Sequence, residues 1–301
     1  PYDALIPALA EAHRIDVDAV ESTVLEQPGE IGADHFLALP AWQRGRAVGS
    51  KLVSVFPVNE KNGSDLPSVQ AVYVLFDGAD GRPLAVIDGT VLTLRKTASD
   101  SGVGASFLAA SAPERMLMVG AGAMGPHLIQ AHLAARPSIT QVSVWNRTPE
   151  RAEALAASLT LPGVQIAATQ DLEGAARAAD VISCATMATE PLIMGEWLKP
   201  GAHLDLVGSY RTDMQECDAA ALQRGSLFVD SPWSAPRDSG EIVSAMATGA
   251  ITEADILATN FDLVRGKHPG RTSDDEITVY KNGGSGHLDL MVAQILMELA
   301  G

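Results

Sequence analysis

The chain has little cysteine, few basic residues and no long apolar run, and each shortage excludes a class of protein. Two cysteines, Cys184 and Cys217, occur in 301 residues, so neither a disulfide framework nor a cysteine-based metal site is expected. Lys and Arg number 21 against 37 Asp and Glu, and the net charge of -16 argues against nucleic acid or a membrane as partner. No apolar run reaches the roughly 18 residues of a membrane span, and no signal peptide is visible, so we expect a cytoplasmic protein.

What is present is an ordinary globular composition with two successive kinds of pattern. Hydrophobic residues make up 47% and charged residues 19%, and the length suggests about two domains. From about 35 to 92, short apolar runs, the last of them PLAVIDGTVLTL, are separated by turn residues, which predicts β-structure before a helix over 97–112. From 116 onward, strand-like and helix-like segments alternate, and a final helix follows the glycine-rich turn at 283–286.

These patterns predict an α/β protein with a doubly wound, Rossmann-type parallel sheet and a smaller α+β domain. The expected dinucleotide-binding domain covers residues 113–270, where helices would lie on both faces of the sheet. The second domain is expected over 1–112, and residues 271–301 return to it. Both ends of the chain would therefore build the smaller domain.

A glycine-rich segment, MLMVGAGAMGPHLI at 116–129, has the spacing G-x-G-x-x-G in Gly120, Gly122 and Gly125. A strand-like run precedes the glycines and an Ala-rich helical segment follows, which is the context of a dinucleotide fingerprint. The first glycine permits a tight turn, the second lets the backbone approach a pyrophosphate, and the third lets helix and strand pack closely. We expect this turn, with Ala123 and Met124 inside it, to bind a nicotinamide dinucleotide.

The residues after the next strand-like run, QVSVW, predict which dinucleotide is bound. Sites for NAD usually carry Asp or Glu there to bind the ribose 2′-hydroxyl. This chain has Asn146, Arg147 and Thr148, so no carboxylate repels a 2′-phosphate and Arg147 is able to pair with one. The sequence therefore favours NADPH, with NADH as the second possibility. The alternative is that Arg147 is only a solvated residue before a helix.

The chain resembles the ornithine cyclodeaminase/μ-crystallin family over nearly its whole length. The resemblance rests on GSKLVSVFPVN, LPSVQAVYVLFD, GRPLAVIDGTVLT, the helix start R-K-T-A-S, the VGAGAMG fingerprint and DEITVYKNGGSG. It implies a homodimer in which N-terminal strands form the interface, and so a substrate-binding and dimerisation role for the smaller domain. It also implies a nicotinamide cofactor and one of three activities: amino-acid cyclodeamination, alanine dehydrogenation or ketimine reduction.

The resemblance assigns the substrate's carboxylate to basic residues of the smaller domain. Lys51 matches the family's substrate-binding lysine, and such a lysine is also able to donate a proton to the substrate nitrogen. The family has arginine directly before Thr-Ala, where this chain has Lys96 before Thr97, so Lys96 is the expected second cation and Arg95 the alternative. Ser68 matches a substrate-contacting position. Thr97 is expected near the cofactor.

Two further positions depart from the family's pattern. Glu30 stands where many members have an arginine, which weakens the transfer of the full carboxylate clamp. Cyclodeaminating members carry an acid/base aspartate in a V-G-G-D type of turn, but here the turn reads Val207, Gly208, Ser209, Tyr210. Tyrosine, with a reference pKa near 10, is a poor base, so the change favours reduction of a preformed C=N bond. Tyr210 is accordingly a catalytic candidate, or else packs over the cofactor.

The sequence thus predicts an NADPH-dependent reductase of cyclic ketimino acids, with Δ1-pyrroline-2-carboxylate as the first candidate substrate and Δ1-piperideine-2-carboxylate as the second. Val207 and Gly208 are expected beside the cofactor, and Gly284 and Ser285 near its nicotinamide end. No metal is expected. Three alternatives stay open: an ornithine or lysine cyclodeaminase with bound NAD, an alanine dehydrogenase, and a non-catalytic protein that binds NADPH or a small ligand.

Overall fold

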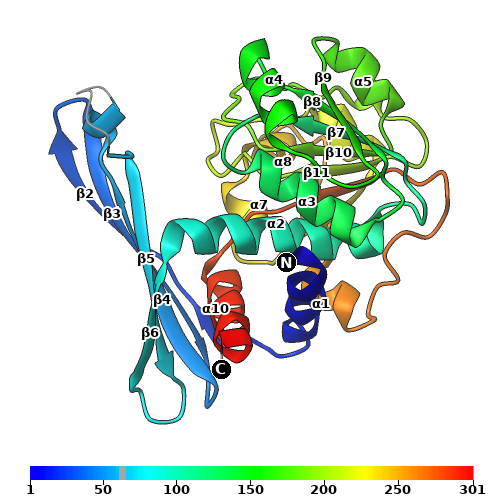
Figure 1. Ribbon diagram of the computed structural model, residues 1–301. Coiled ribbons are helices and arrows are strands. Elements are labelled where there is room, and N and C mark those ends of the chain that lie inside the picture. The colour runs from blue at the N-terminus through cyan, green and yellow to red at the C-terminus, as the bar shows by residue number, and fades with distance from the viewer. Residues whose placement is uncertain (61–65, 301) are drawn as a thin grey trace. The chain divides into compact units, whose positions relative to one another are not determined.

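The computed structural model describes residues 1–60 and 66–300, and its chain divides into two compact units (Figure 1). Unit 1 contains residues 1–14 and 97–284, and unit 2 contains residues 15–96 and 285–301. Each unit therefore combines segments that are far apart in the sequence. The functional names that the sequence suggests for two domains remain predictions at this point.

Unit 2 is built on an antiparallel sheet with the strand order β1-β3-β4-β5-β6, in which β2 also pairs with β3. The strands of this sheet confirm the β-rich region that the turn pattern predicted from about residue 35. The sheet already begins at Ala19, and a short 3-10 helix lies between two of its strands. The elements are β1 (Ala19–Val20), β2 (Thr23–Gly29), β3 (Gly32–Gln43), β4 (Ala47–Val55), η1 (Pro57–Glu60), β5 (Val69–Asp77) and β6 (Pro83–Asp88). The last helix, α10 (Gly286–Ala300), packs on β3 and β4.

Helix α2 (Gly89–Leu108) begins earlier than the sequence predicted, because β6 ends on a capping residue. The Asp88 carboxylate accepts hydrogen bonds from the backbone N–H groups of Thr90 and Val91, at 2.8 and 2.9 Å. These bonds satisfy two of the donors that a helix start leaves without partners. The apolar run GTVLTL, which resembled a strand continuation, is therefore the first part of a helix.

Unit 1 contains an eight-stranded parallel sheet in the order β13-β12-β14-β11-β10-β7-β8-β9. This arrangement confirms the predicted doubly wound α/β fold, although the strand Ile256–Thr259 was not foreseen. The strands are β7 (Arg115–Val119), β8 (Gln141–Trp145), β9 (Gln165–Ala168), β10 (Val181–Cys184), β11 (His203–Leu206), β12 (Ser226–Val229), β13 (Ile256–Thr259) and β14 (Thr278–Lys281). The chain runs outward from β7 through β8 and β9, then restarts at β10 on the other side, so β7 and β10 flank a topological switch point.

A helix or a 3-10 turn lies between each two successive parallel strands of unit 1, as a doubly wound fold requires. These connecting elements are α3 (Gly125–Ala135), α4 (Pro149–Ser158), α5 (Leu172–Ala178), η2 (Gly195–Trp197), α6 (Ala219–Arg224), α7 (Ala235–Asp238), α8 (Gly240–Ala247), η3 (Glu253–Asp255) and α9 (Asn260–Val264). The first helix, α1 (Tyr2–Ala12), precedes the sheet in the sequence and packs on α3 and α9. Within the described chain, none of the helices has the length and apolarity needed to cross a bilayer.

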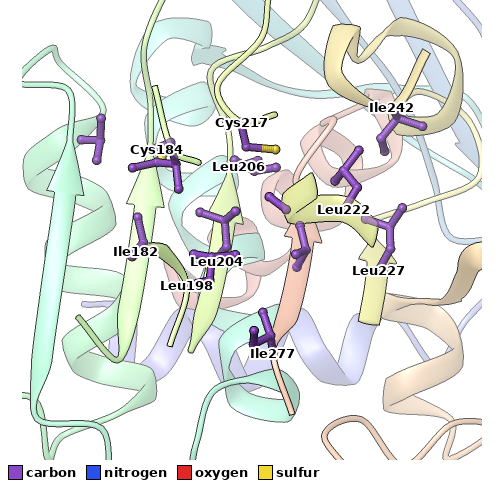
Figure 2. Packing of buried hydrophobic residues seen from close by; sticks show 14 of the residues in the cluster. Ile182, Cys184, Leu198, Leu204, Leu206, Cys217, Leu222, Leu227, Ile242 and Ile277 are labelled. Atoms are coloured by element: carbon purple, nitrogen blue, oxygen red, sulfur yellow. The ribbon is translucent and has the colours of Figure 1, made fainter. Parts of the chain in front are cut away.

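The core of unit 1 lies where β10, β11 and β12 present apolar side chains to the helices α6 and α8 (Figure 2). Ile182, Leu204 and Leu227 are buried on the strands, and Leu222 and Ile242 meet them from the helices. Cys184 and Cys217 belong to the same cluster as free thiols, and burial raises the pKa of each thiol well above its usual value. Cys184 is therefore a core residue whose thiol stays protonated.

Candidate functional site

The glycine-rich turn of unit 1 follows β7 and has the geometry of a dinucleotide fingerprint. Gly120 has a φ of 109°, and a Cβ at this position would overlap the carbonyl oxygen of Ala185, which follows β10. A Cβ on Gly125 would come within 2.9 Å of a Leu155 methyl group and 3.0 Å of the Gly120 oxygen. A Cβ on Gly122 would meet nothing within 4 Å, so this part of the turn is open to a ligand. These residues fit a pyrophosphate at the start of α3.

The turn after β8 is tied to the glycine-rich turn by Asn146. Its Oδ1 accepts a hydrogen bond from the Ala121 N–H at 3.1 Å, and its Nδ2 donates to the Thr148 oxygen at 3.0 Å. Asn146 therefore braces the two turns against each other, a role that the sequence did not reveal. Arg147 and Thr148 are exposed at the end of the strand, where an adenosine ribose would be held.

A buried carboxylate, missed in the sequence, holds the loops that follow β10 and β11. Glu216 Oε1 accepts hydrogen bonds from the N–H of Thr186 at 2.7 Å and its hydroxyl at 2.9 Å. Glu216 Oε2 accepts one from the Gly208 N–H at 2.7 Å. Thr186 lies beside Gly120 of the glycine-rich turn. The Glu216 carboxylate therefore fixes the loop after β10 at the topological switch point. Nothing in the surrounding sequence distinguished Glu216 from an ordinary surface glutamate.

The surroundings of Glu216 perturb its titration. Burial raises the pKa of Glu216 to about 7, against the opposing charge of Lys281 and with a further contribution from Glu241. Lys281, at the end of β14, forms a 3.0 Å ion pair with Glu241 of α8, and both side chains are buried. Glu216, Glu241 and Lys281 thus form a buried group of two carboxylates and one lysine in unit 1.

The residues after β11 occupy different environments. Val207 and Gly208 directly follow β11 and are half-buried, and their place beside a cofactor remains a prediction. Ser209 is buried, donates to the Met214 oxygen at 3.1 Å and accepts from the Gly240 N–H at 3.0 Å. Tyr210 is 55% exposed, with the Arg211 guanidinium 5.7 Å from its ring centre. Its catalytic role remains a prediction.

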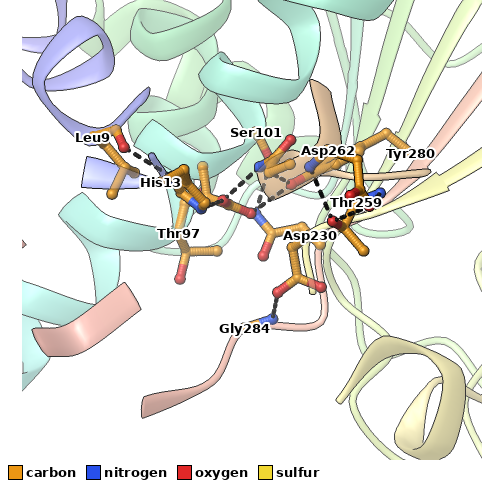
Figure 3. A network of polar contacts seen from close by, with 12 residues as sticks. Leu9, His13, Thr97, Ser101, Asp230, Thr259, Asp262, Tyr280 and Gly284 are labelled. Carbon is orange, nitrogen blue, oxygen red and sulfur yellow. Dashed lines mark hydrogen bonds and ion pairs between the residues drawn. The ribbon is translucent and has the colours of Figure 1, made fainter. Parts of the chain in front are cut away.

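The last glycine-rich turn starts from a polar network inside unit 1 (Figure 3). The Gly284 N–H donates to Asp230 Oδ2 at 2.8 Å, and Gly284 adopts a φ of 63°. Asn282 Nδ2 donates to the Thr97 oxygen at 2.9 Å, so Thr97 is anchored through its backbone and is buried. Asp230, which had no assigned role from sequence, therefore shapes the turn that leads into Ser285.

In unit 2, the two predicted lysines meet at one carboxylate. Lys51 of β4 places its Nζ 3.0 Å from Oδ2 and 3.2 Å from Oδ1 of Asp289, in the first turn of α10. Lys96 of α2 places its Nζ 3.8 Å from Asp289 Oδ1. The exposed fractions are 7% for Lys51, 4% for Lys96 and 0% for Asp289. The sequence offered Asp289 only as a residue near the helix start, and missed this cluster.

The remaining substrate candidates of unit 2 lie in less enclosed positions. Arg95 is half-buried and, because the segment is helical, points about 100° around the helix from Lys96. Ser68 is half-buried at the start of β5, and its carbonyl accepts a hydrogen bond from the Phe56 N–H at 2.8 Å. Glu30, which replaces the family's arginine, is exposed. In the residues that the structure describes, no group of acidic, histidine or cysteine side chains has the geometry of a metal site.

A glycine-rich turn at the switch point of a parallel sheet defines the class: the protein is a nicotinamide-dinucleotide-dependent oxidoreductase. The particular family follows from comparison. A profile of the Ornithine cyclodeaminase/mu-crystallin family matches residues 15–300, and the chain belongs to that family.

Three relatives illustrate how closely the chain matches its family. A Delta(1)-pyrroline-2-carboxylate reductase from Paracoccus denitrificans is 40% identical, over 98% of this chain and 91% of that protein. The Thermococcus litoralis Delta(1)-pyrroline-2-carboxylate reductase, solved with NADH and L-proline, has a TM-score of 0.90 at 29% identity and covers 100% of this chain and 93% of its own. An archaeal alanine dehydrogenase dimer with bound NAD has a TM-score of 0.88 at 28% identity, with coverage of 100% and 92%.

Proposed function

We propose that the protein reduces cyclic ketimino acids with NADPH, converting Δ1-pyrroline-2-carboxylate to L-proline and Δ1-piperideine-2-carboxylate to L-pipecolate. The observation that carries the proposal is the pair of buried lysines, Lys51 and Lys96, gathered on one carboxylate in unit 2. Buried ammonium groups bind a carboxylate far more strongly than solvated ones do. The reductases of this class among the relatives support the choice of substrate.

The proposed chemistry asks little of the protein beyond binding and one proton. When bound, the nicotinamide supplies a hydride, and C2 of the C=N bond accepts it. The ring nitrogen must gain one proton as the double bond becomes CH–NH. The Lys51 ammonium is the proposed donor, and water returns the proton to the resulting amine. Lys96, with Arg95 and Ser68 as lesser candidates, would hold the carboxylate while the site excludes bulk water.

The absence of a carboxylate in the V-G-S-Y turn favours reduction over cyclodeamination. Cyclodeamination needs a base that manages protons on two amines and the loss of ammonia, and the exposed Tyr210 is poorly suited to that task. Alanine dehydrogenation stays a second candidate, because an alanine dehydrogenase shares the fold over the whole chain.

A direct assay tests the proposal. Oxidation of NADPH and NADH is followed with Δ1-pyrroline-2-carboxylate and Δ1-piperideine-2-carboxylate, and pyruvate with ammonia and ornithine serve as comparison substrates. We expect rapid oxidation of NADPH with at least one cyclic ketimine. Ammonia release from ornithine without added reductant would establish a cyclodeaminase, and amination of pyruvate would establish an alanine dehydrogenase. Tight binding of the dinucleotide with no turnover of any substrate would indicate a binding protein.

We also propose that the sheet of unit 2 forms a homodimer through the face opposite Lys51. The register of β3, β4, β5 and β6 puts Phe36, Trp42, Val72 and Val86 on that face, where they are 43–73% exposed. Such a contiguous apolar face is typical of an interface. The alanine dehydrogenase relative is a dimer, which supports this assembly.

The dimer is tested by replacing Val86, the most exposed of these residues, with aspartate. Burying a charge at the centre of an apolar interface is costly, so Val86→Asp should sediment as a monomer. Leu257→Asp is the matched control, since Leu257 is 46% exposed on β13 of unit 1. A wild-type monomer, or a Val86→Asp variant that still sediments as a dimer, would rule the interface out.

A further inference from the structure

Asp289 is a buried carboxylate that the proposed reaction does not use directly. Both of its oxygens lie within 3.2 Å of the Lys51 Nζ, and its Oδ1 lies 3.8 Å from the Lys96 Nζ. The two lysines come from β4 and α2, whereas Asp289 comes from the first turn of α10 near the end of the chain. One carboxylate, from α10, thus brings together two ammonium groups, one from β4 and one from α2.

The backbone that carries Asp289 is held closely against the sheet. A Cβ on Gly286 would come within 3.2 Å of the Leu39 and Pro40 oxygens, so α10 begins at a distance from β3 that only glycine allows comfortably. Further along the same helix, Gln294 Nε2 donates to Gln43 Oε1 at 2.7 Å. Asp289 lies between these two attachments and has little freedom to move relative to β3 and β4.

A buried tyrosine, Tyr73, packs against one side of the cluster formed by Lys51, Lys96 and Asp289. Tyr73 pairs with Lys51 across β4 and β5 and is fully buried. A Cβ on Gly49 would overlap the Tyr73 hydroxyl, so the ring occupies the space that glycine leaves open. Burial, and then the charge of Asp289, raise the pKa of Tyr73 far above its usual value. The ion pair is therefore closed on the Tyr73 side, where its geometry is kept by packing as well as by charge.

The partners of Lys51 leave part of its ammonium available. Of the Lys51 contacts, the one with Asp289 is the shorter. Thr93 Oγ1 lies 3.5 Å from the Lys51 Nζ, and the Thr93 hydroxyl donates its own proton to the Gly89 oxygen at 2.7 Å. An ammonium group has three donors, and in the described part of the chain the Lys51 ammonium donates to these two side chains. The third N–H is able to serve a ligand.

We propose that Asp289 is a positioning residue, which fixes the Lys51 ammonium so that its remaining N–H meets the carboxylate or the nitrogen of the substrate. The proposal rests on the proposed ketimine reduction for the identity of that substrate. It gives Asp289 no contact with the reacting atoms. Its consequence is that losing the carboxylate harms substrate binding mainly through Lys51, which lies at 3.0 Å, and less through Lys96 at 3.8 Å.

The opposite role is also chemically reasonable, and the experiment separates the two. An internal carboxylate on the same lysines would compete with the substrate's carboxylate, and its removal would then tighten binding. A double-mutant cycle of Asp289→Asn and Lys51→Met decides between them, with KM for the ketimine, kcat and Kd for NADPH measured for each variant. Gln294→Ala is the matched control, because it removes a different attachment of α10 to the same sheet.

We expect Asp289→Asn to raise KM for the ketimine about tenfold or more, with Kd for NADPH close to the wild-type value. In the Lys51→Met background the same change should add little, because Asp289 acts through the lysine. Gln294→Ala should leave KM near the wild-type value. A lower KM in Asp289→Asn, or effects of the two changes that simply multiply, would overturn the proposal.

A second measurement covers two further results. If Asp289→Asn does not fold, or if the wild-type protein reduces no cyclic ketimine, the ¹⁵N NMR signal of the Lys51 ammonium is followed in the wild-type protein, with Lys51→Arg used to assign it. A slowly exchanging signal that shifts when L-proline is added supports the positioning role. A rapidly exchanging signal that ignores L-proline refutes it. Absence of turnover with a responsive signal would count against the proposed function only.

Discussion

Each unit contains a buried lysine–carboxylate pair, and the pair of unit 1 differs from the Lys51–Asp289 pair of unit 2 in what surrounds it. In unit 1, Lys281 and Glu241 lie 3.0 Å apart with side-chain exposures of 0% and 1%. In unit 2, Lys51 and Asp289 also lie 3.0 Å apart, but the Lys51 side chain is 8% exposed. A lysine–carboxylate ion pair thus occurs once fully buried in the parallel sheet and once with its lysine slightly exposed to solvent. We call them the sealed pair and the solvent-edge pair. The first is expected to serve stability, and the second to serve binding.

The largest effect should come from breaking the sealed pair. Lys281→Met leaves Glu241 buried without its cation, close enough to Glu216 for the two charges to interact. Removal of one partner of a buried pair costs about 3–5 kcal/mol, and denaturant unfolding monitored by circular dichroism would measure it. The control is Lys199→Met, whose 2.6 Å pair with Asp180 is about one-third exposed and should be worth about 1 kcal/mol or less. Equal losses of unfolding free energy in the two variants would show that the buried pair contributes no more to stability than the partly exposed one.

The second effect concerns the solvent-edge pair and should appear in kinetics. Lys51→Ala removes a charge-assisted contact to the substrate, which is worth about 1.5–3 kcal/mol, or roughly 10- to 100-fold in KM for the ketimine. KM for NADPH should change far less, because the glycine-rich turn and Arg147 belong to the other unit. Steady-state kinetics with each substrate varied in turn gives both values. Unchanged kinetics for the ketimine would remove Lys51 from the site.

The contrast between the two units also explains how far the sequence could predict the site. Gly120, Gly122 and Gly125 lie within six residues of each other, and a local spacing of this kind is readable because local backbone geometry requires it. Lys51 was predicted only through its resemblance to a family position. Asp289 lies 238 residues from Lys51, and nothing in a single sequence records that the fold brings them together.

Two further features that the sequence analysis did not predict have different causes, one local and one not. Helix α2 starts at Gly89 because Asp88 caps it, a signal that was present but was outweighed by the apolar run GTVLTL. Glu216 looked like a surface residue, because burial of a carboxylate depends on donors from Thr186 and Gly208 that only the folded chain assembles. Strand–helix alternation, in contrast, predicted the parallel sheet of unit 1 well, since its central strands β10, β11 and β14 are buried along their whole length.

The third effect tests the cofactor preference of unit 1. Arg147→Ala should weaken NADPH binding by about 1–3 kcal/mol and leave NADH binding nearly unchanged, because only NADPH carries a 2′-phosphate for the guanidinium to pair with. Fluorescence titration of each dinucleotide measures the two dissociation constants. Arg151→Ala, one turn into α4 and also exposed, is the control for loss of a nearby positive charge. Equal weakening of both dinucleotides by Arg147→Ala would refute the 2′-phosphate assignment.

The smallest effect is a pH dependence of stability from Glu216. Its pKa is raised from 4.5 to about 7 in the folded protein, so between these values the folded state holds a proton that the unfolded state has lost. The stabilisation that the extra proton on Glu216 gives to the folded state is therefore complete below about pH 4.5. It falls as the pH rises and is lost above about pH 7. Other groups titrate in the same range, so the comparison with Glu216→Gln isolates this contribution.

Glu216→Gln should be less stable than wild type at every pH, because an amide cannot accept from both the Thr186 and Gly208 N–H groups. The difference between the two proteins should be largest near pH 5 and should shrink toward pH 8, since only the wild type loses its proton in that interval. Denaturant unfolding at pH 5, 6, 7 and 8 measures it. A difference that stays constant with pH, or grows toward pH 8, would mean that Glu216 is ionised throughout and that Lys281 compensates for its burial.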